Sequence, residues 1–154
     1  MTEAPVLVTG AAGFVGSHTV NELLRSGYRV RAAVRGDRKA QSVRETVAAA
    51  GLDPAAVEFV VVELTADDGW AAAVAGTRYV LHIASPFPAA PPEDADDVIV
   101  PARDGTLRVL RHARAAACER VVMTSSFAAV GYSPKPTAVW TERDWTDPGD
   151  DNSA

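Results

Sequence analysis

Short apolar runs alternate with amphipathic segments along the chain, and this alternation constrains the fold more than any other feature. The apolar runs are typical of strands and cover residues 6–10, 28–34, 57–64, 78–84 and 120–126. Helical spacing marks the segments between them, at residues 15–26, 38–50, 66–76 and about 97–118, although Pro101 leaves the start of the last one open. Strands joined through helices form a parallel sheet with right-handed crossovers. We therefore predict an α/β fold, a doubly wound parallel sheet within three α/β/α layers.

Composition limits the class of protein. The 154 residues fit one domain, and 47% hydrophobic with 23% charged residues is typical of a globular core. A net charge of −5 argues against a nucleic-acid-binding protein. No apolar run approaches the roughly 18 residues that span a bilayer, and no secretion signal is visible. Cys118 has no partner for a disulfide. We expect a cytoplasmic protein without a metal site.

The segment TGAAGFVG, residues 9–16, follows the first strand and opens the first helix. Its glycines, Gly10, Gly13 and Gly16, allow a phosphate to approach the backbone at a helix N-terminus. We expect Gly13 to lie nearest the phosphates and Gly16 to allow close helix packing. The alternative is that these glycines serve only a tight turn.

Basic residues follow the second strand. Arg35 comes directly after Val34, and Arg38 and Lys39 follow shortly. Arginine binds a ribose 2′-phosphate with two hydrogen bonds, whereas a free 2′-hydroxyl favours an acid at this place. This pattern favours NADP over NAD, and the alternative is a solvated basic loop.

The next strand ends carry weaker indications. Glu63 could accept a hydrogen bond from an adenine amino group, or it is a surface acid beside a helix start. The small residues Ala84 and Ser85 would leave room for ribose and nicotinamide. His82 lies inside its strand, where a histidine is more often structural than catalytic. The remaining cofactor contacts that we expect are Ala12, Phe14, Val15, Leu64 and Thr124.

The motifs VTGAAGFVGSH, RAAVR, HIASPFP and VVMTSS together resemble the extended short-chain dehydrogenase/reductases, of the dihydroflavonol reductase and cinnamoyl-CoA reductase type. The resemblance covers nearly the whole chain. It implies a Rossmann fold, NADPH, and reduction of a small carbonyl substrate to an alcohol. It also implies that Gly10, Gly13 and Gly16 hold the pyrophosphate, that Arg35 holds the 2′-phosphate, and that Ser126 is the catalytic serine. Glu63 stands where the family usually has aspartate.

The family's proton donor is a tyrosine followed four residues later by lysine, because both side chains must share one helix face. Tyr132 and Lys135 are only three residues apart, and Pro136 stands where the lysine is needed. Pro134 and Pro136 exclude an ordinary helix interior. We predict a loop here, in which Tyr132 is a packing or substrate-side residue and not the general acid.

The resemblance divides the chain into a dinucleotide-binding domain, residues 1–130, and a loop, residues 131–154, that in the family precedes the catalytic helix and substrate domain. Two hypotheses remain open. The chain is the cofactor-binding N-terminal part of an NADPH-dependent carbonyl reductase, or it is a non-catalytic dinucleotide-binding or sensor module. Half of a doubly wound sheet leaves an edge and part of a face uncovered, so we expect a homo-oligomer or a need for the missing half.

Overall fold

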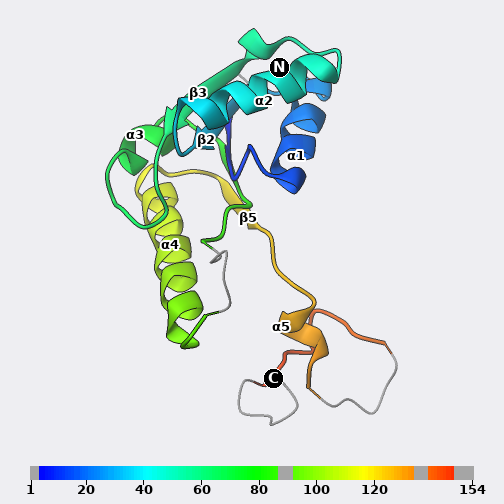
Figure 1. Cartoon of the computed structure of the whole chain (residues 1–154), viewed down its shortest axis with the longest axis vertical. Coiled ribbons are helices and arrows are strands. Elements are labelled where there is room, and N and C mark those ends of the chain that lie inside the picture. The colour runs from blue at the N-terminus through cyan, green and yellow to red at the C-terminus, as the bar shows by residue number, and fades with distance from the viewer. Residues whose placement is uncertain (1–3, 87–91, 134–138, 148–154) are drawn as a thin grey trace. The chain divides into compact units, whose positions relative to one another are not determined.

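A five-stranded parallel sheet forms the centre of the fold in the computed structural model (Figure 1). The structure describes residues 4–86, 92–133 and 139–147. The chain divides into two units, residues 1–123 and 124–154, and each is described by itself. All five strands belong to the first unit: β1 (Val6–Thr9), β2 (Val30–Val34), β3 (Val57–Val61), β4 (Tyr79–His82) and β5 (Arg120–Met123).

The strand order is β3-β2-β1-β4-β5, so the chain reverses its direction across the sheet next to β1. Every neighbouring pair is parallel, and the register places Thr9 opposite both Ala33 and His82. A reversal of this kind places the crevice of a doubly wound sheet beyond the carboxyl ends of its central strands. The predicted Rossmann-type architecture is confirmed.

Helices cover both faces of the sheet, and strand periodicity decides which residue faces which layer. One core cluster joins Val6 and Val8 of β1 to α1 (Phe14–Arg25) and α2 (Asp37–Ala49). The opposite cluster joins Leu7 to α3 (Trp70–Val74) and α4 (Asp96–Ala115). Alternate residues of one strand therefore enter two separate hydrophobic cores, which gives the expected three layers.

All five strands and α3 are shorter in the structure than predicted, and β3 and α3 show this most clearly. β3 ends at Val61 rather than at residue 64, and α3 begins only at Trp70, after Gly69 with φ +80°. A side chain on Gly69 would also press on Val62 Cγ1 at 3.1 Å. A short 3₁₀ helix at Pro54–Ala56, begun by the Asp53 carboxylate, was not predicted from the periodicity.

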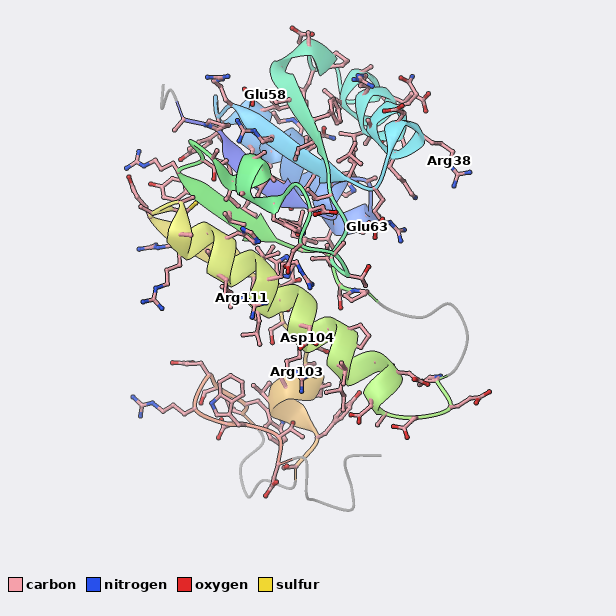
Figure 2. All side chains as sticks on the ribbon, turned by 90° about the vertical axis from the view of Figure 1, so that its left-hand side faces the viewer. Arg38, Glu58, Glu63, Arg103, Asp104 and Arg111 are labelled. Carbon is pink, nitrogen blue, oxygen red and sulfur yellow. The ribbon has the colours of Figure 1, made fainter. Side chains whose placement is uncertain are left out.

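α4 runs through Pro101, although proline removes one backbone donor and crowds the preceding turn. Its buried residues are Gly105, Val109 and Ala113, which recur at every fourth position along one face. Arg103, Asp104 and Arg111 of this helix carry the labels in Figure 2, and Arg103 pairs with Asp104 at 2.8 Å.

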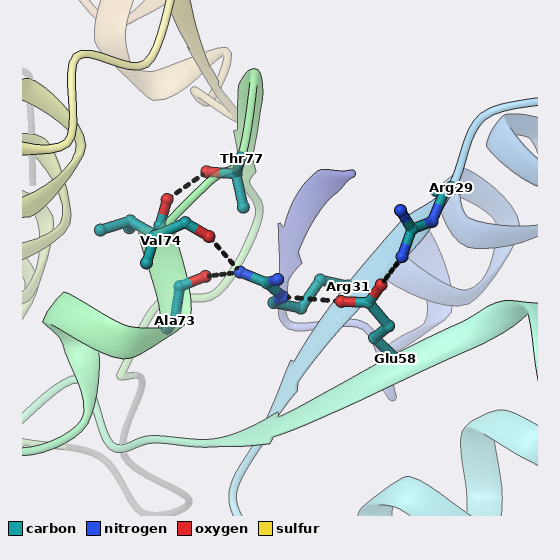
Figure 3. A network of polar contacts seen from close by, with 7 residues as sticks. Arg29, Arg31, Glu58, Ala73, Val74 and Thr77 are labelled. Atoms are coloured by element: carbon teal, nitrogen blue, oxygen red, sulfur yellow. Dashed lines mark hydrogen bonds and ion pairs between the residues drawn. The ribbon is translucent and has the colours of Figure 1, made fainter. Parts of the chain in front are cut away.

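A polar network at the amino end of β2 fixes the end of α3 (Figure 3). Arg31 donates to the carbonyl oxygens of Ala73 and Ala75, at 2.9 and 2.7 Å, and to Glu58 at 3.1 Å. Glu58 also pairs with Arg29. A guanidinium at a helix C-terminus satisfies carbonyls that lack intrahelical partners. This end of the sheet therefore uses its arginines for structure.

The second unit contains the short helix α5 (Ala128–Gly131), which the sequence did not predict. Thr146 connects to it twice: its hydroxyl donates to the Ala128 carbonyl at 2.6 Å, and its amide donates to the Ala129 carbonyl. Phe127 makes edge-to-face contacts with Tyr132 and Trp140 at 6.1 and 6.4 Å.

α4 ends with an alanine in the left-handed backbone region. Ala117 has φ +53°, and the Cys118 amide donates to the Ala113 carbonyl while the Ala117 amide donates to Arg114. This hydrogen-bond pattern is the Schellman motif, in which glycine usually holds the left-handed position. Alanine there costs roughly 1–2 kcal/mol of conformational energy.

We expect Ala117→Gly to raise the free energy of unfolding by up to about 1 kcal/mol, because relief of the left-handed strain exceeds the added entropy of the unfolded chain. Ala115→Gly is the matched control. It lies in the helix with ordinary geometry and should lower stability by about 1 kcal/mol. Urea unfolding followed by circular dichroism measures both. A loss of stability in both variants would contradict the strain at Ala117.

Candidate functional site

The glycine turn after β1 is built on contacts between backbones. Gly10 has φ +68°, and a Cβ at this position would lie 2.9 Å from the Ala84 amide nitrogen. A Cβ on Gly16 would lie far inside the van der Waals contact distance from the Gly10 carbonyl oxygen. Gly10 therefore allows the turn to touch the end of β4, and Gly16 allows α1 to pack on the turn.

Gly13 has different surroundings. It is exposed, its backbone is extended, and a Cβ there would meet only the Gly10 carbonyl oxygen, at 3.3 Å. It caps α1 without a side chain that could accept hydrogen bonds from the first helical turn. The amides of that turn lack intrahelical acceptors, and the helix dipole favours an anion in front of them. The turn thus presents an open helix N-terminus of the kind that binds phosphate.

Four strand ends lie in a row beside this turn. Thr9 of β1 lies opposite Ala33 of β2. Gly10 follows Thr9, and Val34 and Arg35 follow Ala33, so Gly10 lies beside Val34 and Arg35. The Val62 amide continues the pairing to the Val34 carbonyl at 3.0 Å, and Glu63 follows. The order of the row is Glu63, Arg35, Gly10 and Ala84, because the strand order is β3-β2-β1-β4.

The charges at the end of β2 are exposed. Arg35 precedes Gly36, whose φ of +153° favours glycine, and Gly36 caps α2. Arg38 lies in the first turn of α2, and Figure 2 shows its side chain extending away from the fold. Both guanidinium groups are available to a ligand at this edge, in contrast to Arg31.

The loop after β3 is held from two sides. The buried Trp70 donates its indole N–H to the Glu63 carbonyl at 2.8 Å, and Arg108 of α4 donates to the Leu64 carbonyl and to Asp67. The hydrogen bond from Arg108 lowers the pKa of Asp67. The Leu64 side chain packs on the α3–α4 core, whereas Glu63 is exposed. The loop therefore has a fixed backbone with an outward carboxylate.

The other predicted contact residues differ in exposure. Phe14 is 81% exposed and Val15 is 53% exposed on the first turn of α1, and Ala12 is half-buried. Phe14 also lies edge-on to His18, with ring centroids 4.8 Å apart. Ser85 is exposed and Ala84 half-buried at the end of β4.

Thr124 and Ser126 belong to the second unit. Thr124 directly follows the last residue of β5, and both residues are exposed. Ser126 Oγ accepts the Ala128 amide at 3.2 Å. This bond uses one lone pair and leaves the hydroxyl proton able to donate.

Tyr132 follows α5 directly, its amide donates to Thr146 Oγ1 at 3.1 Å, and its ring packs on Phe127. Lys135 and the two flanking prolines lie outside the described residues. The prediction that Tyr132 does not pair with Lys135 in a helix stays a prediction.

Sequence reasoning missed the residues that hold the strand ends in place. Thr9, Trp70 and Arg108 bind backbone atoms that lie 7 to 75 positions away in the chain. No periodic pattern marks such contacts. The sequence signal for these contacts was limited to the placement of Trp70 and Arg108 on the inward sides of their helices.

The described part of the chain shows neither a membrane-spanning helix nor a cluster of metal-ligating side chains. Residues 4–86, 92–133 and 139–147 contain no helix with the length and apolar character to cross a membrane. The same residues contain no group of three or more metal-ligating side chains.

We expect Gly16→Ala to lower the free energy of unfolding by about 3 kcal/mol, because the added methyl group forces α1 away from the Gly10 turn. Gly13→Ala adds the same methyl group at an allowed backbone conformation with one tight contact, 3.3 Å from the Gly10 carbonyl oxygen, so its cost should stay below about 1 kcal/mol. Denaturant unfolding of the two variants provides the comparison. Equal losses would contradict the different packing of the two glycines.

The chain is similar to known proteins along nearly its whole length. The family described as "NAD dependent epimerase/dehydratase family" matches residues 6–153. Dihydroflavonol 4-reductase of Hordeum vulgare is 32% identical over 146 residues, 94% of this chain and 41% of that protein. Cinnamoyl-CoA reductase CAD2 of Medicago truncatula is 37% identical over 132 residues, 85% of this chain and 40% of that protein.

Solved structures of reductases are also similar to this chain. Yeast methylglyoxal/isovaleraldehyde reductase Gre2, complexed with NADPH, superposes with a TM-score of 0.77 at 30% identity, over 97% of this chain and 45% of that one. Vestitone reductase from alfalfa gives 0.73 at 30% identity, over 94% and 43%. This chain spans between 40% and 45% of the length of these relatives. The match over residues 6–153 shows that the chain belongs to the NAD dependent epimerase/dehydratase family.

Proposed function

We propose that this chain binds NADPH and is the cofactor-binding part of a reductase that converts a small carbonyl compound to an alcohol. The observation that carries the proposal is the open helix N-terminus at Gly13, in a turn whose Gly10 lies next to the exposed Arg35 in the row of strand ends. An uncapped helix start attracts a pyrophosphate, and a neighbouring guanidinium attracts a 2′-phosphate.

The row of strand ends fits the parts of a dinucleotide in order. Glu63 and Leu64 would border the adenine, and Arg35 with Arg38 would bind the 2′-phosphate. The turn Gly10–Gly16 with Ala12, Phe14 and Val15 would hold the pyrophosphate, and Ala84, Ser85 and Thr124 would border the nicotinamide ribose. The fit is supported at Gly13, where a side chain would stand in the space in front of the helix amides.

The relatives support the choice of cofactor. The yeast reductase in the comparison was solved with NADPH, and a related protein from Candida albicans was also solved with NADPH, with a TM-score of 0.78 at 29% identity. Several sequence relatives carry the names of reductases of carbonyl-containing compounds. The exposed arginines after β2 give a physical reason for the same preference in this chain.

Bound NADPH would supply a hydride, and the protein must then orient the carbonyl and provide a proton. Ser126 suits the first task, because its oxygen accepts the Ala128 amide and its hydroxyl proton can be donated to a carbonyl oxygen. The second task needs a general acid within hydrogen-bond distance of that oxygen.

One observation favours a second candidate function. None of the tyrosines is followed four residues later by lysine: positions 32, 83 and 136 are Ala32, Ile83 and Pro136. The 154 residues therefore suit a non-catalytic dinucleotide-binding module as well as part of an enzyme. Turnover separates the two candidates, and cofactor binding is common to both.

We expect Arg35→Ser to weaken NADPH binding by about tenfold or more, which corresponds to the loss of a charged hydrogen bond of roughly 1.5–3 kcal/mol. NADH lacks the 2′-phosphate, so its affinity should stay nearly unchanged. Titration calorimetry with both cofactors measures the difference. Arg31→Ser is the matched control at the other end of β2, and it should lower stability without changing the ratio of the two affinities. Equal weakening of both cofactors by Arg35→Ser would refute the assignment.

We expect the 154-residue chain to bind NADPH without oxidising it in the presence of aldehydes or ketones, since it holds no Tyr-x-x-x-Lys pair. In a longer protein that includes this pair, Ser126→Ala should lower turnover by roughly 10²-fold or more with the NADPH affinity retained. The absorbance of NADPH reports turnover. Steady turnover by the 154-residue chain that Tyr132→Phe abolishes would show that Tyr132 is the acid after all.

A further inference from the structure

A buried hydrogen-bonded junction joins β1 to β4 directly below the candidate site. Thr9 Oγ1 accepts the amides of Ile83 and Ala84, each at 3.0 Å, and lies 2.8 Å from Nδ1 of His82. The His82 side chain is 2% exposed. Ala84 is also the residue whose amide Gly10 touches. The junction therefore supports the contact between the glycine turn and the end of β4.

The hydrogen bonds determine where the protons lie. A hydroxyl group has one proton and two lone pairs. The amides of Ile83 and Ala84 occupy both lone pairs of Thr9 Oγ1, so the bond to His82 must use the hydroxyl proton. Nδ1 of His82 is then an unprotonated acceptor, and the neutral ring carries its proton on Nε2.

The surroundings of His82 favour this neutral ring. Burial lowers the pKa of His82. In register, its strand neighbours are Thr9 and Met123, neither of which titrates near neutral pH. α3 has no titratable residue. The titratable side chains in the loop before α3 and beside the buried stripe of α4 are Glu63, Asp67, Asp68, Asp104, Arg108 and His112. Arg108 is bound to Asp67.

We infer that His82 is a positioning residue for the dinucleotide site: by accepting the Thr9 proton it directs both Thr9 lone pairs to the amides of Ile83 and Ala84, and protonation of the ring withdraws this support. A protonated Nδ1 is a donor, so Thr9 Oγ1 would have to accept from it and release one of the two amides. The end of β4 beside Gly10 would then loosen.

The inference predicts a direction with pH. The folded-state pKa of His82 lies below the unfolded value of about 6.5, so the unfolded chain takes up the proton first. Folding stability due to this group is therefore complete above pH 6.5 and falls as the pH drops toward the folded-state pKa. Dinucleotide affinity should weaken over the range in which the folded protein takes up this proton. The effect on affinity rests on the proposed function, whereas the proton assignment does not.

The first experiment needs no ligand. Nitrogen-15 chemical shifts of the His82 ring should show an unprotonated Nδ1 and a protonated Nε2 at about pH 7.5. The protection factors of the Ile83 and Ala84 amides, corrected for the intrinsic exchange rate at each pH, should fall together as the ring titrates. A neutral ring with its proton on Nδ1 would overturn the inference. Protection factors of the Ile83 and Ala84 amides that stay constant while the ring titrates would also overturn it, whether or not the chain binds a dinucleotide.

The second experiment measures NADPH affinity from about pH 7.5 to about pH 5 in variants. His82→Asn keeps an acceptor without a titration, so its affinity should stay within about threefold of wild type at pH 7.5 and should lack the additional loss at low pH. Thr9→Ser keeps the hydroxyl and should retain the wild-type profile. Thr9→Val removes the acceptor of both amides and should weaken binding by about tenfold or more.

His18→Gln is the control for the exposed histidine on α1, and it should keep the wild-type pH profile. Because the ligand is the same in every arm, the titration of its own phosphate cancels in the ratio of variant to wild type. An unchanged pH profile in His82→Asn would overturn the inference. Absence of NADPH binding by the wild type would refute the proposed function and leave the nitrogen-15 and amide-exchange results to decide the inference.

Discussion

Backbone contact between α1 and the turn after β1 is the constraint on which the rest of the structure depends. Gly16 lets the helix approach the Gly10 carbonyl, and Gly10 in turn touches the Ala84 amide. Three elements, β1, α1 and β4, thus meet without an intervening side chain. This close approach aims the N-terminus of α1 at the edge of the sheet where the other strand ends also emerge, which is the edge at which doubly wound sheets bind their ligands.

The two ends of the sheet use the same residue types in different ways. At the amino end, Arg31 is committed to two carbonyls and a carboxylate, and on α4 the 13% exposed Arg108 is committed to the loop after β3. At the carboxyl end, Arg35 and Arg38 are exposed. Desolvated arginines with several partners stabilise the fold, whereas solvated ones contribute little to stability. Changes in cofactor preference at Arg35 are therefore compatible with an unchanged fold.

Much of this architecture could be predicted from the sequence, because apolar periodicity is a local property. The five strands, the four main helices and the buried stripe at Gly105, Val109 and Ala113 follow from it. The ends of elements depend on distant contacts. α3 begins only at Trp70, which binds the distant Glu63 carbonyl, and only the assembled sheet brings Thr9 to His82, 73 positions away. The glycine spacing predicted the turn, but not that Gly13 is exposed with a single neighbour for a Cβ, whereas Gly10 and Gly16 are closely packed.

Two described segments at the carboxyl edge of the sheet are tied down by bonds within the protein. Trp70 and Arg108 hold the loop after β3, and Thr9 holds the residues after β4. A ligand that contacts these two segments orders little of them, so it loses little affinity to their conformational entropy. Their contribution to the heat-capacity change on binding should then reflect the surface that they bury against the ligand, and not the folding of either segment around it.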